Sequence, residues 1–259
     1  MNFLKLVGLT IALFAATSAA GESSVGIVLI HGKGGNPSGH IAPLVRALSS
    51  QGFRVSAPSM PWSKQRAYDA DYSSALAEIE AAANSLREKG AKKIIVGGHS
   101  LGANAAIAYA ASGRDVDGVM AIAPGHVPDS GMWRDTFGPS VEKARQMIAE
   151  GKGDTADTFA DLNQGKSTSI QTTAKIYLSY FDPEGLGSMP SSVAKFPRPI
   201  PFLWVIGTKD RLMQQGEAYA FARAPKHSNS KYLVVEADHL STPTDASAQI
   251  AEWLRSLGY

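Results

Sequence analysis

The chain has 259 residues, of which 44% are hydrophobic, so it is long and apolar enough for one large or two small cores. Lysine and arginine exceed aspartate and glutamate by only two (25 against 23), and no basic block is evident, which argues against a nucleic-acid-binding protein. The absence of cysteine excludes disulfides, a cysteine nucleophile, thiolate metal sites and a lipid-modified N-terminal cysteine.

Residues 1–20 have the features of a secretory signal peptide. Lys5 supplies a positive charge, residues 6–16 are apolar, and small residues precede Gly21. The apolar run is shorter than the roughly 20 residues that a spanning helix needs, so cleavage is favoured over an uncleaved anchor. We therefore expect a mature protein of residues 21–259 that is periplasmic or secreted and has no stable membrane association.

Short β-rich runs alternate with longer helical patterns along the mature chain, which is typical of a parallel sheet with crossover helices. The sequence therefore predicts one α/β domain with a doubly wound, mostly parallel sheet of about six strands and helices on both faces. We expect strands at 26–30, 53–57, 93–96, 118–123, 201–206 and 231–235, and helices at 40–50, 72–89, 101–111 and 246–257.

The connection between Pro124 and Pro201 is far longer than most crossover connections. It contains a helical pattern at 141–150, then a polar stretch, then an apolar run at 176–181 that fits either a helix or a strand. Ligands bind beyond the carboxyl ends of the strands in open α/β sheets, and this segment starts at such an end. We interpret residues 125–198 as a lid-like or cap-like insertion.

The most informative motif is Gly98-His99-Ser100-Leu101-Gly102, between the strand expected at 93–96 and the helix expected at 101–111. A G-x-S-x-G motif in a strand–turn–helix context is typical of a nucleophile elbow. The two flanking glycines allow the strand and the helix to approach closely. We therefore predict Ser100 as a nucleophile; the alternative is a serine that merely tolerates a tight turn.

His239 is the predicted general base among the six histidines. It follows the last expected strand by a short loop and precedes the closing helix, so it can reach over the elbow serine from the same sheet edge. His99 adjoins Ser100, and neighbouring side chains at a turn diverge. We expect His31 to have a structural role in a glycine-rich loop and His126 to line a pocket. His40 and His227 are expected to be exposed to solvent.

Asp210 is the favoured partner to orient His239, because it emerges directly after the strand expected at 201–206. Asp182 is the rival, since some folds of this kind take the acid from the preceding strand. Asp238 is too close to the histidine in sequence, and Asp117 lies at the opposite edge of the sheet.

Two backbone N–H groups are predicted to stabilise an oxyanion. One belongs to Leu101, just after the nucleophile, and the other to Lys33 in the loop His31-Gly32-Lys33-Gly34-Gly35. Losing one such donor typically costs about 3–4 kcal/mol of transition-state stabilisation. Because both donors belong to the main chain, replacing the Lys33 side chain is expected to do much less. The loop lacks the spacing of a phosphate-binding P-loop.

These motifs together resemble the α/β-hydrolase superfamily over residues 26–259, in particular its small, dienelactone-hydrolase-like or esterase-like members. The order Ser100, Asp210, His239 is the order of that family. The resemblance implies Ser100 as nucleophile, His239 as base and then acid, and Asp210 as its orienting group. The oxyanion loop differs from the H-G-G-G form of some lipases, and the chain has no room for two antiparallel strands before the first parallel one.

The resemblance implies an exported serine hydrolase that cleaves a small-molecule carboxylic ester or thioester through an acyl-enzyme. The alternatives are a serine peptidase or amidase of the same fold and a non-catalytic binding protein on a hydrolase scaffold. No cofactor is implied, and no metal, because no His or carboxylate cluster has ligand spacing. The candidate pocket residues are His31, Trp62, His126, Met132 and Trp133; for Trp62, Met132 and Trp133 the alternative is packing in the core or the lid.

Overall fold

The computed structural model describes residues 24–259, so the predicted signal peptide lies outside the described residues. Its centre is a six-stranded sheet in the order β2-β1-β3-β4-β7-β8, with every neighbouring pair parallel. This confirms the predicted sheet. The strands are β1 (Val25–Ile30), β2 (Arg54–Ser56), β3 (Lys93–His99), β4 (Gly118–Ile122), β7 (Phe202–Gly207) and β8 (Lys231–Val235).

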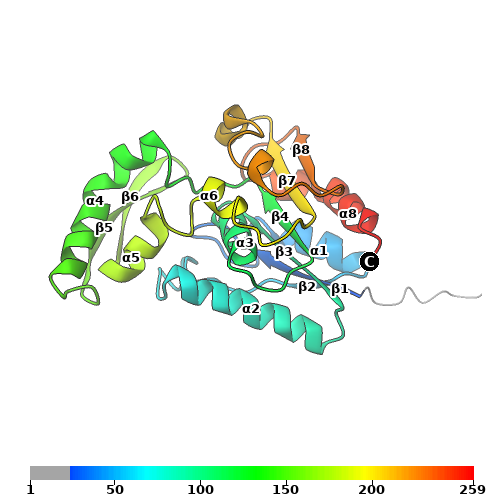
Figure 1. Cartoon of the computed structure of the whole chain (residues 1–259), viewed down its shortest axis with the longest axis horizontal. Helices are drawn as coiled ribbons and strands as arrows, with labels where there is room; N and C mark the ends of the chain where they lie inside the picture. The colour runs from blue at the N-terminus through cyan, green and yellow to red at the C-terminus, as the bar shows by residue number, and fades with distance from the viewer. Residues whose placement is uncertain (1–23) are drawn as a thin grey trace, which may run out of the picture.

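Helices cover both faces of the sheet, as predicted (Figure 1). Successive side chains of a strand point to opposite faces, so β1 divides its apolar residues between two cores. Val28 and Ile30 pack in the core with α2 and α3, whereas Ile27 and Leu29 pack in the core with α1 and α8. The four helices are α1 (Ala42–Ser50), α2 (Tyr72–Glu88), α3 (Leu101–Ala111) and α8 (Ser247–Ser256), and the short helix α7 (Thr242–Asp245) precedes α8.

The strand order reverses direction between β1 and β3, because β2 lies on one side of β1 and all later strands lie on the other. The loop after β1 and the turn after β3 therefore open at one point of the same sheet edge, where open α/β sheets bind ligands. The predicted oxyanion loop and the predicted elbow serine both lie there.

Most of the chain between β4 and β7 forms a separate layer, the cap, which stands at one end of the sheet (Figure 1). The apolar run at 176–181, which fitted a helix or a strand, lies in a helix. The helix expected at 141–150 begins ten residues earlier, where Ser130 Oγ accepts a hydrogen bond from the Trp133 N–H. The cap contains α4 (Gly131–Ala149), β5 (Ala156–Asn163), β6 (Lys166–Thr173) and α5 (Ala174–Phe181). The rest of this segment returns to the sheet domain, where α6 (Met189–Val193) lies beside α3 (Figure 1), and β7 is followed by the 3₁₀ turns η1 (Arg211–Gln215) and η2 (Phe221–Arg223).

The antiparallel hairpin β5–β6 is the element that the sequence did not predict. Most side chains of β6 are exposed and polar, so no alternation of apolar residues marks it. Its turn does carry a local signal. Gln164 and Gly165 have φ values of 51° and 75°, the left-handed conformation of a two-residue hairpin turn.

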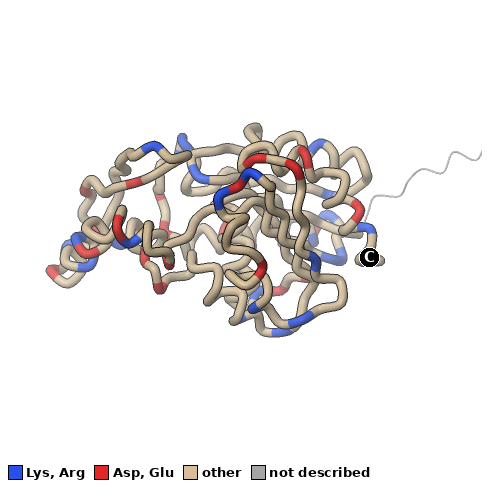
Figure 2. The backbone as a smooth tube through the Cα atoms, turned by 90° about the horizontal axis from the view of Figure 1, so that it is seen from above, with Lys and Arg blue, Asp and Glu red and all other residues tan. Residues whose placement is uncertain are grey.

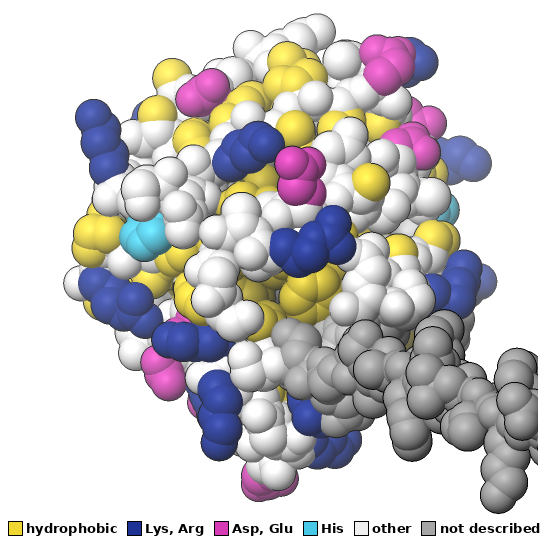
Figure 3. All heavy atoms as spheres, turned by 90° about the vertical axis from the view of Figure 1, so that its right-hand side faces the viewer, with side chains coloured by type: hydrophobic (Ala, Val, Ile, Leu, Met, Phe, Trp, Pro, Cys, Tyr) yellow, Lys and Arg dark blue, Asp and Glu magenta, His cyan; other side chains and the backbone are white. Residues whose placement is uncertain are grey.

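Charged side chains of both signs are distributed over the sheet domain and the cap (Figure 2). On the face seen in Figure 3, Lys and Arg side chains are interspersed with Asp and Glu. Within residues 24–259, no helix combines the length and apolarity needed to cross a membrane. The same part of the chain has no group of three or more His, Asp or Glu side chains placed to hold a metal ion.

Candidate active site

Ser100 occupies a strained turn between β3 and α3, with φ 56° and ψ −122°. A left-handed φ is uncommon for a residue with a side chain, and such strain concentrates at functional sites. The turn is possible because both flanking residues are glycine. A Cβ atom on Gly98 would collide with the backbone of Gly102, and one on Gly102 would collide with the carbonyl oxygen of Ile30. At the elbow, β1, β3 and α3 therefore pack closely against one another around the serine.

Ser100, His239 and Asp210 form a continuous chain of hydrogen bonds. The Nε2 atom of His239 is 3.0 Å from Ser100 Oγ, and its Nδ1 atom is 2.6 Å from Asp210 Oδ2. An ionised carboxylate only accepts, so Nδ1 carries the proton and Nε2 is free to accept from the serine hydroxyl. Asp210 is buried, and its other oxygen accepts from the Leu212 N–H, which fixes the carboxylate at the start of η1.

The rival acid Asp182 lies elsewhere, at the end of α5 in the cap. One of its carboxylate oxygens accepts from the Arg145 guanidinium at 3.1 Å and from the Glu184 N–H. These contacts tie the cap together and leave Asp210 as the partner of His239.

The loop after β1 passes directly beside the serine. A Cβ atom on Gly32 would come within 2.9 Å of Ser100 Cβ. The loop and Ser100 line a cleft of about 180 Å³, together with residues just before α1, in the cap hairpin and in the loop after β8. The side chains and backbone that line it belong to residues 31–36, His40, Ile41, His99, Ser100, Asn163, Gln164 and Leu240.

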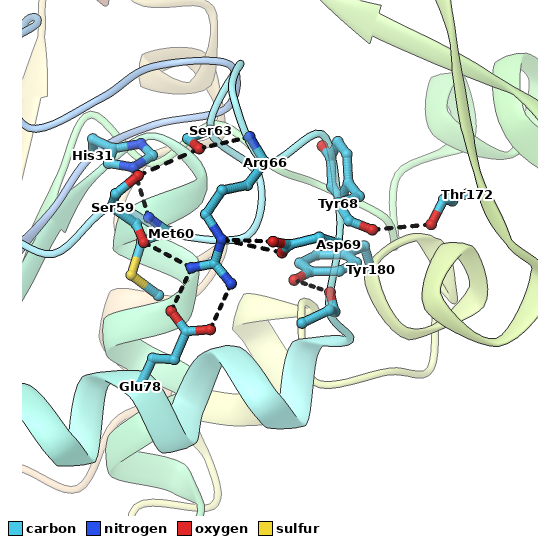
Figure 4. Close-up of polar contacts among 11 residues, drawn as sticks. His31, Ser59, Met60, Ser63, Arg66, Tyr68, Asp69, Glu78, Thr172 and Tyr180 are labelled. Atoms are coloured by element: carbon cyan, nitrogen blue, oxygen red, sulfur yellow. Dashed lines mark hydrogen bonds and ion pairs between the residues drawn. The ribbon is translucent and has the colours of Figure 1, made fainter.

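His31 holds this loop in shape. Its Nδ1–H donates to the Gly32 carbonyl at 2.8 Å, and its Nε2 accepts from the Met60 N–H at 3.0 Å (Figure 4). Burial lowers the pKa of His31, which keeps the ring in the neutral form that this pairing requires. The Trp62 indole donates to the His31 carbonyl at 2.9 Å, and the Gly34 N–H donates to the Trp62 carbonyl.

Residues 59–70, between β2 and α2, connect this loop to the cap (Figure 4). Arg66 secures the connection by pairing with Glu78 at 2.6 Å and Asp69 at 2.9 Å, and by donating to the Ser59 carbonyl. On the cap side, Thr172 Oγ1 donates to the Tyr68 carbonyl at 3.0 Å. The position of the cap is therefore linked, through residues 59–70, to the position of the loop after β1.

Of the candidate pocket residues, His31 lines the cleft and the other four do not. Trp62 is buried beneath the loop, and Trp133 stacks on Phe181 inside the cap. His126 is buried and donates from Nε2 to the Tyr180 carbonyl, while Met132 is 71% exposed at the start of α4. These four side chains serve packing or face solvent, so the pocket role predicted for them is wrong for this cleft.

The sequence missed the contribution of the cap hairpin. Asn163 and Gln164 line the cleft, and Asp161 forms an ion pair with the Lys33 side chain at 2.6 Å. Only the Gln164-Gly165 turn dipeptide could have suggested a hairpin, and nothing in the sequence indicates which loop its tip contacts.

Comparison with known proteins places this geometry in context. The family model of the alpha/beta hydrolase family matches residues 27–253. No curated protein matches the chain. Among solved structures, Est1E from Butyrivibrio proteoclasticus, bound to ferulic acid, is similar at 17% identity with a TM-score of 0.67, covering 92% of this chain and 91% of the other.

Two further structures are similar at this level. The monoacylglycerol lipase of Paleococcus ferrophilus has 21% identity and a TM-score of 0.65, with 89% of this chain and 94% of the lipase covered. A thioesterase domain from the curacin biosynthetic pathway has 17% identity and a TM-score of 0.54, with 89% and 90% covered. At these identities the likeness concerns the fold.

Proposed function

Because this chain belongs to the alpha/beta hydrolase family, we propose that it is a serine hydrolase that cleaves a carboxylic ester or thioester through an acyl-enzyme. One observation carries the proposal: the hydrogen-bonded chain from Ser100 through His239 to Asp210 at the edge of an open cleft. A serine hydroxyl is a weak nucleophile alone, and an adjacent base oriented by a carboxylate is the arrangement that activates it.

In the first half of the proposed reaction, Ser100 Oγ attacks the carbonyl carbon while His239 Nε2 takes the hydroxyl proton. The carbonyl oxygen becomes an oxyanion, stabilised by the backbone N–H groups of Leu101 and Lys33. Collapse of the tetrahedral intermediate breaks the bond to the alcohol or thiol, which leaves with the proton from His239. Asp210 stays ionised and stabilises the imidazolium in between.

In the second half, water takes the place of the leaving group. His239 accepts a proton from the water as its oxygen attacks the acyl carbon, and then returns it to Ser100 Oγ as the carboxylic acid departs. The similar structures include a monoacylglycerol lipase and a thioesterase domain, which supports an ester or thioester as the substrate class.

A fluorophosphonate probe tests the proposal, because it reacts covalently with an activated serine. We expect labelling of the purified protein and hydrolysis of p-nitrophenyl butanoate, and loss of both in Ser100→Ala. A folded wild-type protein that is neither labelled nor active would contradict the proposal and favour a non-catalytic binding protein. Faster cleavage of an amide than of its matched ester would instead favour a peptidase.

Export belongs to the same proposal and rests on the N-terminal sequence alone. We infer that residues 1–20 direct secretion and are removed. N-terminal sequencing of protein recovered from the periplasm or medium of an expressing bacterium tests this, with Gly21 expected as the first residue. Protein that stays in the cytoplasm with Met1 intact would contradict it.

A further inference from the structure

The tip of hairpin β5–β6 forms one wall of the cleft beside Ser100. Asn163 and Gln164 both line the cleft, although they lie more than sixty residues from Ser100 in the sequence. The tip also touches the oxyanion loop, since a Cβ atom on Gly34 would come within 3.1 Å of Asn163 Nδ2. A bound acyl group on this side of the serine therefore meets two primary amides.

The Lys33 side chain fastens this hairpin to the oxyanion loop. Its ammonium group lies 2.6 Å from Asp161 Oδ1 and donates to the Leu162 carbonyl at 3.1 Å. It also lies over the Phe181 ring, 5.1 Å from the ring centre. The Lys33 side chain is 11% exposed and that of Asp161 is 6% exposed, so water screens the pair little. Lys33 thus joins a predicted oxyanion donor to the residues just before the hairpin tip.

His239 defines which side of the cleft receives which part of the ester. It must protonate the leaving alcohol, so the alcohol lies on its side. Asp238 and Leu240, the sequence neighbours of His239, line a second and larger cleft of about 410 Å³, and His40 and Leu240 belong to both clefts. The acyl group, on the side of Ser100 away from the leaving alcohol, then faces the hairpin tip.

Resting on the proposed function, we propose that the hairpin tip selects esters with short acyl groups and that Lys33 is the positioning residue that holds the tip in place. The cleft of about 180 Å³ is smaller than the roughly 300–1,000 Å³ of sites for drug-sized ligands. Its wall of amides and backbone offers hydrogen bonds, which a long alkyl chain would leave unmade.

Lys33→Met tests the positioning role, because it keeps an unbranched apolar stem but removes the ammonium group and leaves Asp161 buried without its cation. Lys175→Met is the matched control. Lys175 also pairs with a cap aspartate, Asp154, at 2.7 Å, but both side chains are exposed. Gln164→Gly tests the wall directly. Gln164 has a φ of 51°, which glycine adopts without strain, so this variant removes an amide from the cleft and keeps the turn.

The measurement is kcat/KM for p-nitrophenyl butanoate and octanoate, with fluorophosphonate labelling of each variant. We expect the wild type and Lys175→Met to prefer butanoate. In Lys33→Met and Gln164→Gly, the ratio of kcat/KM for butanoate to kcat/KM for octanoate should fall by about tenfold. This is comparable to the discrimination given by one poorly fitting methylene. The change should lie mainly in KM for octanoate, whereas general damage to the fold would lower both rates in proportion.

Several outcomes would overturn the inference. A labelled, active wild type that prefers octanoate would do so, as would an unchanged ratio in both Lys33→Met and Gln164→Gly. If Lys33→Met does not fold, the ratio in Gln164→Gly decides. A wild type that is neither labelled nor active overturns the proposed function, and this inference with it.

Discussion

His99 donates a hydrogen bond from Nε2 to the carbonyl oxygen of His239, over 2.8 Å, and the two rings lie 5.0 Å apart between centres. Burial, and secondarily the charge of His239, lower the pKa of His99 to about 3. Its ring is therefore neutral near pH 7, with its single proton on Nε2. The residue before the elbow serine cannot reach the serine hydroxyl, but it holds the main chain that carries the proposed base.

Removing this hydrogen bond should slow catalysis without abolishing it. We expect His99→Leu to lower kcat by about two- to tenfold, because one such bond contributes about 0.5–1.5 kcal/mol. His99→Gln retains an N–H donor at a similar distance from the backbone and should lose less. Steady-state kinetics on p-nitrophenyl butanoate measure both, and a His99→Leu enzyme with the kcat of the wild type would show that the bond does not position His239.

Replacement of aspartate by the isosteric asparagine should have very different effects at the two candidate acids. Asp210→Asn leaves His239 with a partner that no longer favours the reactive tautomer, so we expect kcat to fall by about 10³–10⁴. Asp182→Asn affects a partly exposed ion pair with Arg145 and a local hydrogen bond from the Glu184 N–H, both away from Ser100, and should change kcat by less than about twofold. A larger loss from Asp182→Asn than from Asp210→Asn in ester hydrolysis would reverse the assignment.

The centre of the sheet was predictable because its inner strands are buried on both faces and read as continuous apolar runs. Residues 25–30 of β1 and the end of β3 are entirely buried. The spatial proximity of Ser100, Asp210 and His239 followed from the same fact. Residues that come directly after parallel strands meet at one sheet edge, whatever their distance along the chain.

The cap was predictable only as an insertion. Hairpin β5–β6 has polar residues, Asp161 and Thr172, at buried positions as well as at exposed ones, so its strands lack the alternation that identifies strands in sequence. The role of the Lys33 side chain depends on a contact with Asp161, 128 residues away, which no local pattern encodes. Trp62 and Trp133 were predicted to line the pocket because they are large and apolar, but the same property places them in the interior.

The elbow should tolerate no side chain at Gly102. A methyl group there would collide with the Ile30 carbonyl, and backbone cannot move aside as the end of a side chain can. We expect Gly102→Ala to destabilise the protein by about 3 kcal/mol or more, at or above the usual range for overpacked cores. Gly131→Ala is the control, because its added methyl group meets open space. Urea unfolding compares the two, and equal midpoints would contradict the close packing described for the elbow.

His126 should make the protein less stable in mild acid. Burial, and secondarily the positive charge of Lys33, lower the pKa of His126 to about 3, from about 6.5 in an unfolded chain. Between these values the unfolded chain binds the additional proton. The stabilising contribution of neutral His126 is therefore complete above about pH 6.5 and declines as the pH falls, by about 1.4 kcal/mol per pH unit.

His126→Gln isolates this effect from the titration of the carboxylates. Glutamine keeps an N–H donor for the Tyr180 carbonyl, which His126 Nε2 contacts at 2.7 Å, but it does not titrate. We expect the free energy of unfolding to fall more steeply in the wild type than in His126→Gln between about pH 6 and about pH 4.5, by about 1.4 kcal/mol per pH unit. Parallel slopes for the wild type and His126→Gln in urea unfolding would mean that His126 can accept a proton in the folded protein near its ordinary pKa.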